Sequence, residues 1–411
     1  MHGRRAVAAV LSLLWIPASG AAQYFGQNKV RYETLDWEVL KSDRFEIHYV
    51  ARQRDSVGQF GRMAERWYER LSQVLGHHLP PGQPLILYDS HTAFRGTTVI
   101  PGFISETTGG VTEGLRRRIV MPMAGPLGET DHVLGHELVH AFQYDITTPR
   151  DAKGMAVGTP GAVALPLWFI EGMAEYLSLG PEDPHTAMWM RDALAREEFP
   201  SLKQLDHPKY FPYRFGHAFW AYVAGKYGDE VIGRMLKVAG QTRSWEAAIR
   251  TVLAVSPEEL GRLWQEALRE RFLPVLEAAH PAAEQGRLLV SRKAGGGRLN
   301  LSPVLSPDGR LMIFYSERDL VSVDLFLYDV EAGAVRGRLT NTAVDPHLDS
   351  LQFINSAGAW SPDGRSIAFA NEFRHDPDKA IYEHLLPALE GHGYHTLDEM
   401  SPIIRRLFPN S

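Results

Sequence analysis

Two histidines and a glutamate near the middle of the chain have the spacing of a metal site. They stand in the string His-Glu-Leu-Val-His as His136, Glu137 and His140. Residues four apart lie on one face of a helix, so both imidazoles can reach the same ion. Glu137 would project beside the ion, where a general base takes a proton from the attacking water. A string this short also occurs by chance, but the surrounding segment is apolar, and unpartnered ionisable groups are costly there.

A second acidic pair follows in the segment from Trp168 to Tyr176. Glu171 and Glu175 are also four apart, in otherwise apolar surroundings. One carboxylate can complete a set of three ligands, and the other can accept the free ring N–H of a ligand histidine and fix its tautomer. The alternative is a pair of exposed acids on an amphipathic helix. Two histidines and one glutamate suit zinc, with a fourth position open for catalysis, so we expect one zinc ion per chain.

A hydrolytic site also needs a donor for the oxyanion that forms on the attacked carbonyl. Tyr213 and His217, four apart at the start of a predicted helix, are the candidates, with Tyr210 as a weaker alternative. Equally, Tyr213 could simply pack, and His217 could be a core histidine with satisfied hydrogen bonds. A substrate strand could add to the extended segment Gly109–Glu113, because peptides bind exposed sheet edges in this way.

The elements that would hold these residues are strands followed by helices. Apolar patterns predict strands over 45–50, 84–88 and 118–121. Helical spacing and end signals predict helices over 56–75, 131–144, 167–179, 213–227 and 257–279. Thr130 or Asp131 is expected to cap the helix with the histidine pair, and Ser256 the last helix. Gly172 is expected to let the two ligand-bearing helices approach closely.

Together, the two motifs resemble those of the gluzincin metalloproteases, in particular the peptidase MA-like group of exported bacterial proteins. The similarity covers about residues 25–271, and the string Gly-His-Glu-Leu-Val-His-Ala-Phe-Gln-Tyr is its most specific part. It implies a zincin-like α+β domain, in which a mixed sheet is joined to a helical part, and a zinc metallopeptidase activity. It also implies that Glu171 is the third ligand and that Glu175 lies behind a ligand histidine. The segment 147–166 is longer than in thermolysin-like relatives and is expected to form a loop.

A change in composition marks a second unit in the last third of the chain. A Gly-rich linker is expected over 285–300, and a Ser-Pro-Asp-Gly-Arg turn before an apolar strand then occurs twice, at 306–310 and 361–365. Such turns are typical of hairpins, and a repeat of this length is typical of propeller blades. The repeats resemble those of TolB-like β-propellers over 301–373. This predicts an incomplete all-β propeller-like segment that could bind a protein partner, followed by an unassigned tail over 374–411.

The amino terminus has the pattern of an export signal. Basic residues within 2–5 precede an apolar core over 6–17 and small residues before a cleavage site, which predicts a signal peptide over 1–22 that is cleaved near Ala22. The metalloprotease domain would then cover 23–284 and act in the periplasm or outside the cell. An uncleaved anchor is the alternative, although the apolar run is shorter than the roughly 20 residues that cross a bilayer.

Composition narrows the possible functions. A formal net charge of -6 over 411 residues argues against a nucleic-acid binder, which usually has a basic face. The basic run Arg116 to Arg118 is expected to be a solvated strand end, and His77 with His78 a surface turn. We therefore expect an exported zinc metallopeptidase that acts on peptides or proteins and has no stable membrane span. The alternative is a catalytically idle zinc-binding domain that serves, with the propeller repeats, as an interaction module.

Overall fold

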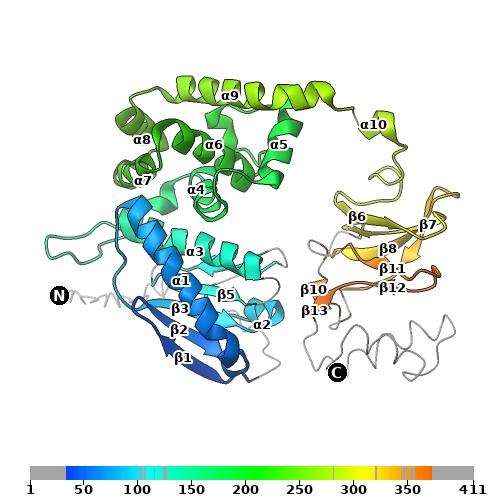
Figure 1. The fold of residues 1–411 in the computed structure, drawn as a ribbon, viewed down its shortest axis with the longest axis horizontal. Helices are drawn as coiled ribbons and strands as arrows, with labels where there is room; N and C mark the ends of the chain where they lie inside the picture. Colours follow the sequence, from blue (N-terminus) through cyan, green and yellow to red (C-terminus); the bar gives the residue numbers. More distant parts are fainter. Residues whose placement is uncertain are drawn as a thin grey trace, which may run out of the picture.

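The computed structural model describes residues 34–372, except 101–103, 106–107, 115, 124–126, 281, 320–321, 344, 346–347, 349, 352 and 354–356. The predicted signal peptide and the tail over 374–411 lie outside the described residues. The first part of the chain contains β1 (Trp37–Lys41), β2 (Phe45–Val50), α1 (Arg54–Leu75), β3 (Gln83–Tyr88), α2 (His91–Arg95), β4 (Val111–Thr112), β5 (Ile119–Pro122) and α3 (Leu127–Thr147) (Figure 1). Helices then follow as α4 (Leu167–Leu179), α5 (Pro184–Ala195), α6 (Pro212–Tyr227), α7 (Glu230–Thr242), α8 (Trp245–Ala248), α9 (Pro257–Ala278) and α10 (Ala282–Gln285). The last part contains β6 (Asn300–Leu305), β7 (Leu311–Ser316), β8 (Asp324–Asp329), β9 (Ala334–Arg338), β10 (Ser350–Leu351), β11 (Ala359–Trp360), β12 (Ile367–Ala368) and β13 (Asn371–Glu372).

The first five strands form one mixed sheet in the order β1-β2-β3-β5-β4. β2, β3 and β5 are parallel neighbours, with Ile47 opposite Leu85 and Leu85 opposite Ile119. β1 and β4 run antiparallel to the strands beside them. The mixed sheet and its predicted strands are therefore confirmed. In the described part of the chain, β4 pairs with β5 alone, so it forms an edge of the sheet.

The parallel strands bury one face of this sheet beneath helices. Phe45, Ile47 and Leu85 point into a core that α1 and α3 share, and the apolar residues of α1 recur every three or four positions, as a single buried face requires. The residues of α3 from 134 to 143 are all buried. A helix that is buried all round must lie between two layers. Figure 1 shows these layers, the sheet on one side of α3 and the helices α4 to α9 on the other.

Two glycines set the contact between α4 and α6. A Cβ atom added to Gly172 would lie 2.3 Å from Cα of Gly216, and one added to Gly216 would lie 2.1 Å from the carbonyl oxygen of Trp168. Neither position has room for a side chain. The prediction that Gly172 brings the two ligand-bearing helices together is wrong, because its Cα faces α6 and not α3.

The helix that carries His136 and His140, α3, begins one turn earlier than predicted. Neither Thr130 nor Asp131 caps α3, because both lie within the helix, and the Asp131 carboxylate instead accepts a hydrogen bond from Trp67 Nε1 of α1 at 2.9 Å. The additional turn over 127–129 is exposed, so no apolar periodicity marks it in the sequence. The prediction at the last helix is confirmed. Ser256 caps α9 and accepts a hydrogen bond from the backbone N–H of Glu259 at 3.1 Å.

A buried carboxylate near the end of α3 joins three other segments of the chain. Asp145 is 2% exposed, and it contacts His77 Nε2 at 2.7 Å, Arg150 Nη2 at 2.8 Å and the guanidinium of Arg117. Burial alone would raise the pKa of Asp145, but the hydrogen bond to His77 and the two guanidinium charges hold it below its ordinary value. The predictions of a solvated strand end at Arg117 and a surface turn at His77 miss these contacts. Asp145 thus fixes the loops around α3.

The last part of the chain is all-β. The strands β6 to β9 form a four-stranded antiparallel sheet, and β11 pairs with β12 in a short hairpin. The two repeated turns have the same hydrogen bond, from Ser306 Oγ to Asp308 and from Ser361 Oγ to Asp363, each at 2.6 Å. A four-stranded antiparallel sheet is the unit of a propeller blade, but the described residues form one such sheet. The propeller therefore stays a prediction. None of the described helices is both long enough and apolar enough to span a membrane.

Candidate metal centre

Three side chains from α3 and α4 bring one ligand atom each to a common point. His136 and His140 lie on successive turns of α3, and their Nε2 atoms are 3.1 Å apart. Oε2 of Glu171, on α4, lies 3.2 Å from each of them. Zinc ligands at about 2.0–2.1 Å from the ion in tetrahedral directions lie about 3.3 Å from one another. The nearly equilateral triangle therefore fits three ligands of one zinc ion, and the predicted ligand residues are the ones brought together.

The charges around this triangle favour a cation at its centre. Burial lowers the pKa of His136, but the hydrogen bonds to Glu171 and Glu175 outweigh this effect and raise the pKa to about 10. The pKa of His140 is raised as well, because the charge of Glu171 outweighs burial. Burial would raise the pKa of Glu171, yet the two histidines hold it below its ordinary value. The three side chains therefore hold a proton when no metal is bound, and a metal cation can take the place of that proton.

Each ligand histidine has an oxygen acceptor behind its ring. Nδ1 of His136 lies 3.0 Å from Oε1 of Glu175, and Nδ1 of His140 lies 2.8 Å from Oε1 of Gln143. The Gln143 amide in turn donates to the carbonyl oxygen of Ile170 at 2.9 Å. Acceptors at Nδ1 favour protonation there and leave Nε2 free to bind a metal. Glu175 lies where the sequence places it, whereas Gln143 was not predicted, and its position three residues after His140 was the available signal.

Glu137 is fixed beside the triangle by strand β4. It is 6% exposed, and its Oε2 accepts a hydrogen bond from Thr112 Oγ1 at 2.6 Å. The same hydroxyl lies 2.8 Å from the Glu137 carbonyl oxygen. A Cβ atom added to Gly110 would lie 2.8 Å from Cγ of Glu137, so the chain before β4 crosses directly over this side chain. The segment Gly109–Glu113 therefore runs along the metal group, while the contact made by Thr112 had no signal in the sequence.

Tyr213 and His217, the two candidate oxyanion donors, lie in different places. The ring of Tyr213 stacks on His136, and its phenol lies near the carboxylate of Glu171. His217 is 1% exposed, and its Nε2 lies 2.9 Å from the carbonyl oxygen of Gly180. The prediction of His217 as an oxyanion donor is therefore wrong. Four residues advance a helix by about 6 Å, and this carries His217 past the metal group to the end of α4.

Tyr210, the weaker alternative, packs elsewhere. Its ring contacts Phe215, with centroids 5.3 Å apart, and the ring of His207. Of the three aromatic candidates, Tyr213 is therefore the one that contacts the metal ligands. Burial, together with the charges of Glu171 and Glu137, raises its pKa, so the phenol is protonated at neutral pH and can donate a hydrogen bond.

Two further residues near the site were missed by the sequence reasoning. His132 lies one turn before His136, and its Nε2 is 3.5 Å from Glu175 Oε1. Arg214 follows Tyr213, and its Nη1 lies 2.8 Å from Glu175 Oε2. The spacing of His132, His136 and His140 on one helix face was a signal for the first residue. Arg214 had no comparable signal, because its partner lies 39 residues away in the chain.

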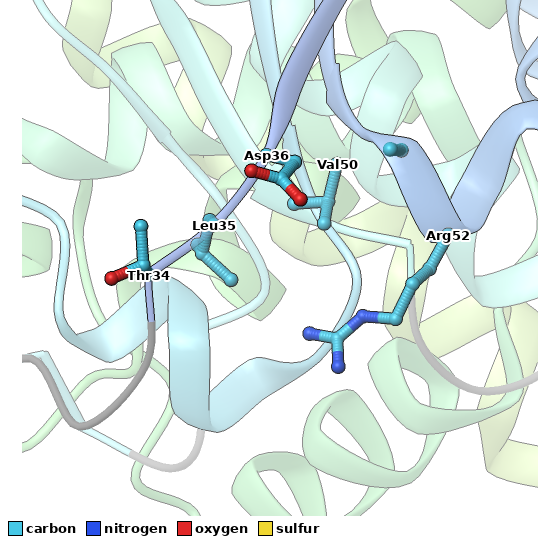
Figure 2. Close-up of a pocket in the computed structure, with 6 residues that line it drawn as sticks. Thr34, Leu35, Asp36, Val50 and Arg52 are labelled. Atoms are coloured by element: carbon cyan, nitrogen blue, oxygen red, sulfur yellow. The ribbon is translucent and has the colours of Figure 1, made fainter.

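A pocket of about 360 Å³ lies apart from the metal group. It is lined by residues 34–36 and 50–52, at the start of β1 and the end of β2 (Figure 2). Arg52, one of the labelled lining residues, pairs with Asp89 at 2.6 Å. The pocket shares no lining residue with the metal group, and we assign it no role in the chemistry.

Comparisons with known proteins do not identify a family. No family profile matches the sequence, and no curated protein matches it. Solved structures of M1 zinc metallopeptidases match part of the chain, among them a two-domain enzyme variant bound to L-arginine, with 16% identity and a TM-score of 0.33, and an enzyme from Deinococcus radiodurans, with 18% identity and a TM-score of 0.31. Each match covers 56% of this chain and 51% of the other, so this chain spans about half the length of those structures. These scores are too low to establish a common fold.

Proposed function

We propose that this chain is a zinc-dependent metallopeptidase of the gluzincin type, with one zinc ion held by His136, His140 and Glu171 in a domain over 23–284. The observation that carries the proposal is the triangle of three ligand atoms, 3.1–3.2 Å apart, beside a buried glutamate that is not part of it. When bound, zinc would polarise the attacked carbonyl and lower the pKa of water at the open position. A purely structural zinc site would normally have a fourth Cys or His ligand.

The residues around the triangle have complementary roles. The Thr112 hydroxyl donates a hydrogen bond to Oε2 of Glu137. The other oxygen, Oε1, can then take the proton of the attacking water and pass it to the leaving amine. Tyr213 donates a hydrogen bond to the oxyanion that forms on the carbonyl. An extended peptide would lie along β4, which among the described strands pairs with β5 alone and forms an edge of the sheet. The substrate is therefore a peptide or an extended segment of a protein.

The decisive experiment measures metal content and peptide cleavage on the same preparations of the full chain. Wild type should contain about one zinc per chain and cleave members of a peptide library. His140→Ala should lose the zinc, and Glu137→Gln should retain it but lose cleavage. Zinc binding without cleavage of any peptide would favour the catalytically idle interaction module. A folded wild-type protein that refuses zinc would contradict both functions.

We also propose that the protein is exported and that the propeller-like repeats over 301–373 bind a protein partner. The first proposal is supported by the basic and apolar pattern at the amino terminus. Terminal sequencing of the protein from the periplasm and from the medium tests it. A terminus at Gln23 is expected, whereas an intact terminus in the cytoplasm would contradict export.

A further inference from the structure

The first turn of α6 reaches the ring of His136 from two sides. Tyr213 stacks on the ring, and its neighbour Arg214 contacts Glu175, the carboxylate behind Nδ1 of that ring. We propose that Arg214 is a positioning residue of the metal centre, which orients the Glu175 carboxylate and thereby sets the tautomer and position of the His136 ring. The inference rests on the proposed zinc site and assigns a role within it to a residue on a third helix.

Arg214 determines which oxygen of Glu175 faces the histidine. Its Nη1 donates to Glu175 Oε2 at 2.8 Å, so the other oxygen, Oε1, is turned toward Nδ1 of His136 at 3.0 Å. A carboxylate without a partner at Oε2 can rotate about its last bond and lose this approach. Because an acceptor at Nδ1 is what leaves Nε2 unprotonated for a metal, the orientation of Glu175 bears directly on metal binding.

Arg214 also supplies charge that the histidine cannot supply in the loaded protein. The Glu175 side chain is 5% exposed and that of Arg214 19% exposed, so solvent compensates little of the negative charge. A metal-ligating histidine is neutral, and it then no longer balances the carboxylate. The guanidinium remains positive under all relevant conditions. Arg214 therefore places a fixed positive charge against the Glu175 carboxylate, independently of what the ligand group binds.

The arginine is itself held in place by the end of another helix. Its Nη1 also contacts Oδ2 of Asp183 at 3.1 Å. That same oxygen caps α5 by accepting a hydrogen bond from the backbone N–H of Thr186 at 2.6 Å. A continuous polar chain thus runs from the start of α5 through Arg214 and Glu175 to His136. The glycine contact between α4 and α6 keeps the two middle members of this chain at a fixed distance.

A second metal position is the rival explanation for the polar groups behind His136. His132, Nδ1 of His136 and Glu175 also lie close enough to share an ion. Their contacts to Oε1 of Glu175, 3.5 and 3.0 Å, are less even than those of the first group. The guanidinium of Arg214 on the same carboxylate would repel a second cation. The uneven distances and the guanidinium therefore favour a charged support for His136 over a second metal site.

The test compares zinc dissociation constants, measured by competition with a chelator, for the full-length wild type and two variants. Arg214→Met removes the charge and the hydrogen bonds, and we expect the dissociation constant to rise about 10- to 100-fold. Arg214→Lys keeps a charge and should fall between this variant and the wild type. Arg262→Met is the matched control, since Arg262 pairs with Glu259 and Glu266 on exposed α9, and it should leave zinc binding unchanged. Nitrogen-15 spectra of the loaded proteins should show His136 protonated at Nδ1 in the wild type and a shifted signal in Arg214→Met.

Each outcome bears on the proposal. An unchanged dissociation constant and an unchanged His136 signal in Arg214→Met would overturn it, while the proposed function would stand. If Arg214→Met does not fold, Asp183→Asn decides, because asparagine still caps α5 but removes the charge that anchors Arg214. Weaker zinc binding in that variant supports the proposal, and unchanged binding overturns it. Two zinc ions per wild-type chain, one of them lost in His132→Gln, would overturn it in favour of the second metal position. A wild type that binds no zinc would overturn the proposed function together with this inference.

Discussion

The ring of Tyr213 lies nearly parallel to that of His136, with centroids 5.9 Å apart and planes inclined by 19°. The stack joins the first turn of α6 to the central helix of the site. It also brings the phenol near Glu171, and burial together with the charges of the nearby carboxylates raises the pKa of Tyr213. A phenol that stays protonated can donate to an oxyanion but cannot act as a general base at neutral pH. The relationship therefore separates the role of Tyr213 from that of Glu137.

Replacement of Tyr213 by Phe should remove this donor and leave the stack in place. We expect kcat to fall about 10²- to 10³-fold, as for other oxyanion donors, with zinc content unchanged. Steady-state kinetics on one cleaved peptide measure this. His217→Asn is the matched control. It should lower the melting temperature through the lost contact to Gly180 but change kcat by less than about threefold. A large loss of kcat in the control with little loss in Tyr213→Phe would reverse the assignment.

Replacement of Thr112 should lower the catalytic rate and leave zinc binding unchanged. Its hydroxyl donates to Glu137 Oε2, and Thr112→Val removes the hydroxyl with little change in shape. A hydrogen bond to a charged group contributes roughly 1.5–3 kcal/mol, so kcat should fall about 10- to 100-fold. Thr112→Ser should restore most of it. Kinetics and metal analysis on the same samples check this prediction, which fails if the two variants have equal rates.

Zinc affinity should depend on pH in one direction. In the metal-free protein, the proton on His136 has a pKa of about 10. This pKa is raised above the ordinary histidine value of about 6.5. Protonation of His136 therefore stabilises the folded, metal-free protein fully below about pH 6.5, and this stabilisation is lost as pH rises through about 10. Zinc must displace that proton, so affinity should increase about tenfold per pH unit from pH 6 to 8. Chelator competition at several pH values measures this. Affinity that does not change with pH would contradict it.

The glycine contact behind the site predicts a sharp difference between two alanine variants. Gly172→Ala would place a Cβ atom 2.3 Å from the backbone of Gly216, and overpacking of this kind costs about 1–3 kcal/mol or more. Gly225 lies on the same α6, and an added Cβ would meet nothing within 4 Å. Gly225→Ala should therefore stabilise the protein by about 0.5–1 kcal/mol. Denaturant unfolding of both variants measures the two free energies of unfolding, and equal values would contradict the contact.

The sequence predicts those parts of the site in which the residues lie on one face of the same helix. His136 and His140 share one face of α3 because they are four residues apart, and Glu171 and Glu175 share one face of α4 for the same reason. The parallel core strands were equally predictable, the first from its alternation of apolar and polar residues and the other two from short apolar runs. These features follow from spacing and hydrophobicity without knowledge of the partner segment.

The contacts between distant segments could not be predicted in this way. Thr112 lies 25 residues before Glu137, and Arg214 lies 39 residues after Glu175. Spacing along one helix says nothing about which side chain of another element approaches it. The same limit explains the error at His217, which shares a helix face with Tyr213 but lies beside a different part of α4.

Asp145 has a consequence for the order in which the protein is assembled. Its contacts hold the loop after α1 through His77, the turn before β5 through Arg117, and the connection between α3 and α4 through Arg150. None of these residues belongs to the candidate metal group, so their contacts around the site do not require a bound ion. From these contacts we expect the domain to fold before it binds a metal ion. A chain that crosses a membrane before it folds could in this way acquire its metal afterwards, from whatever supply its destination holds.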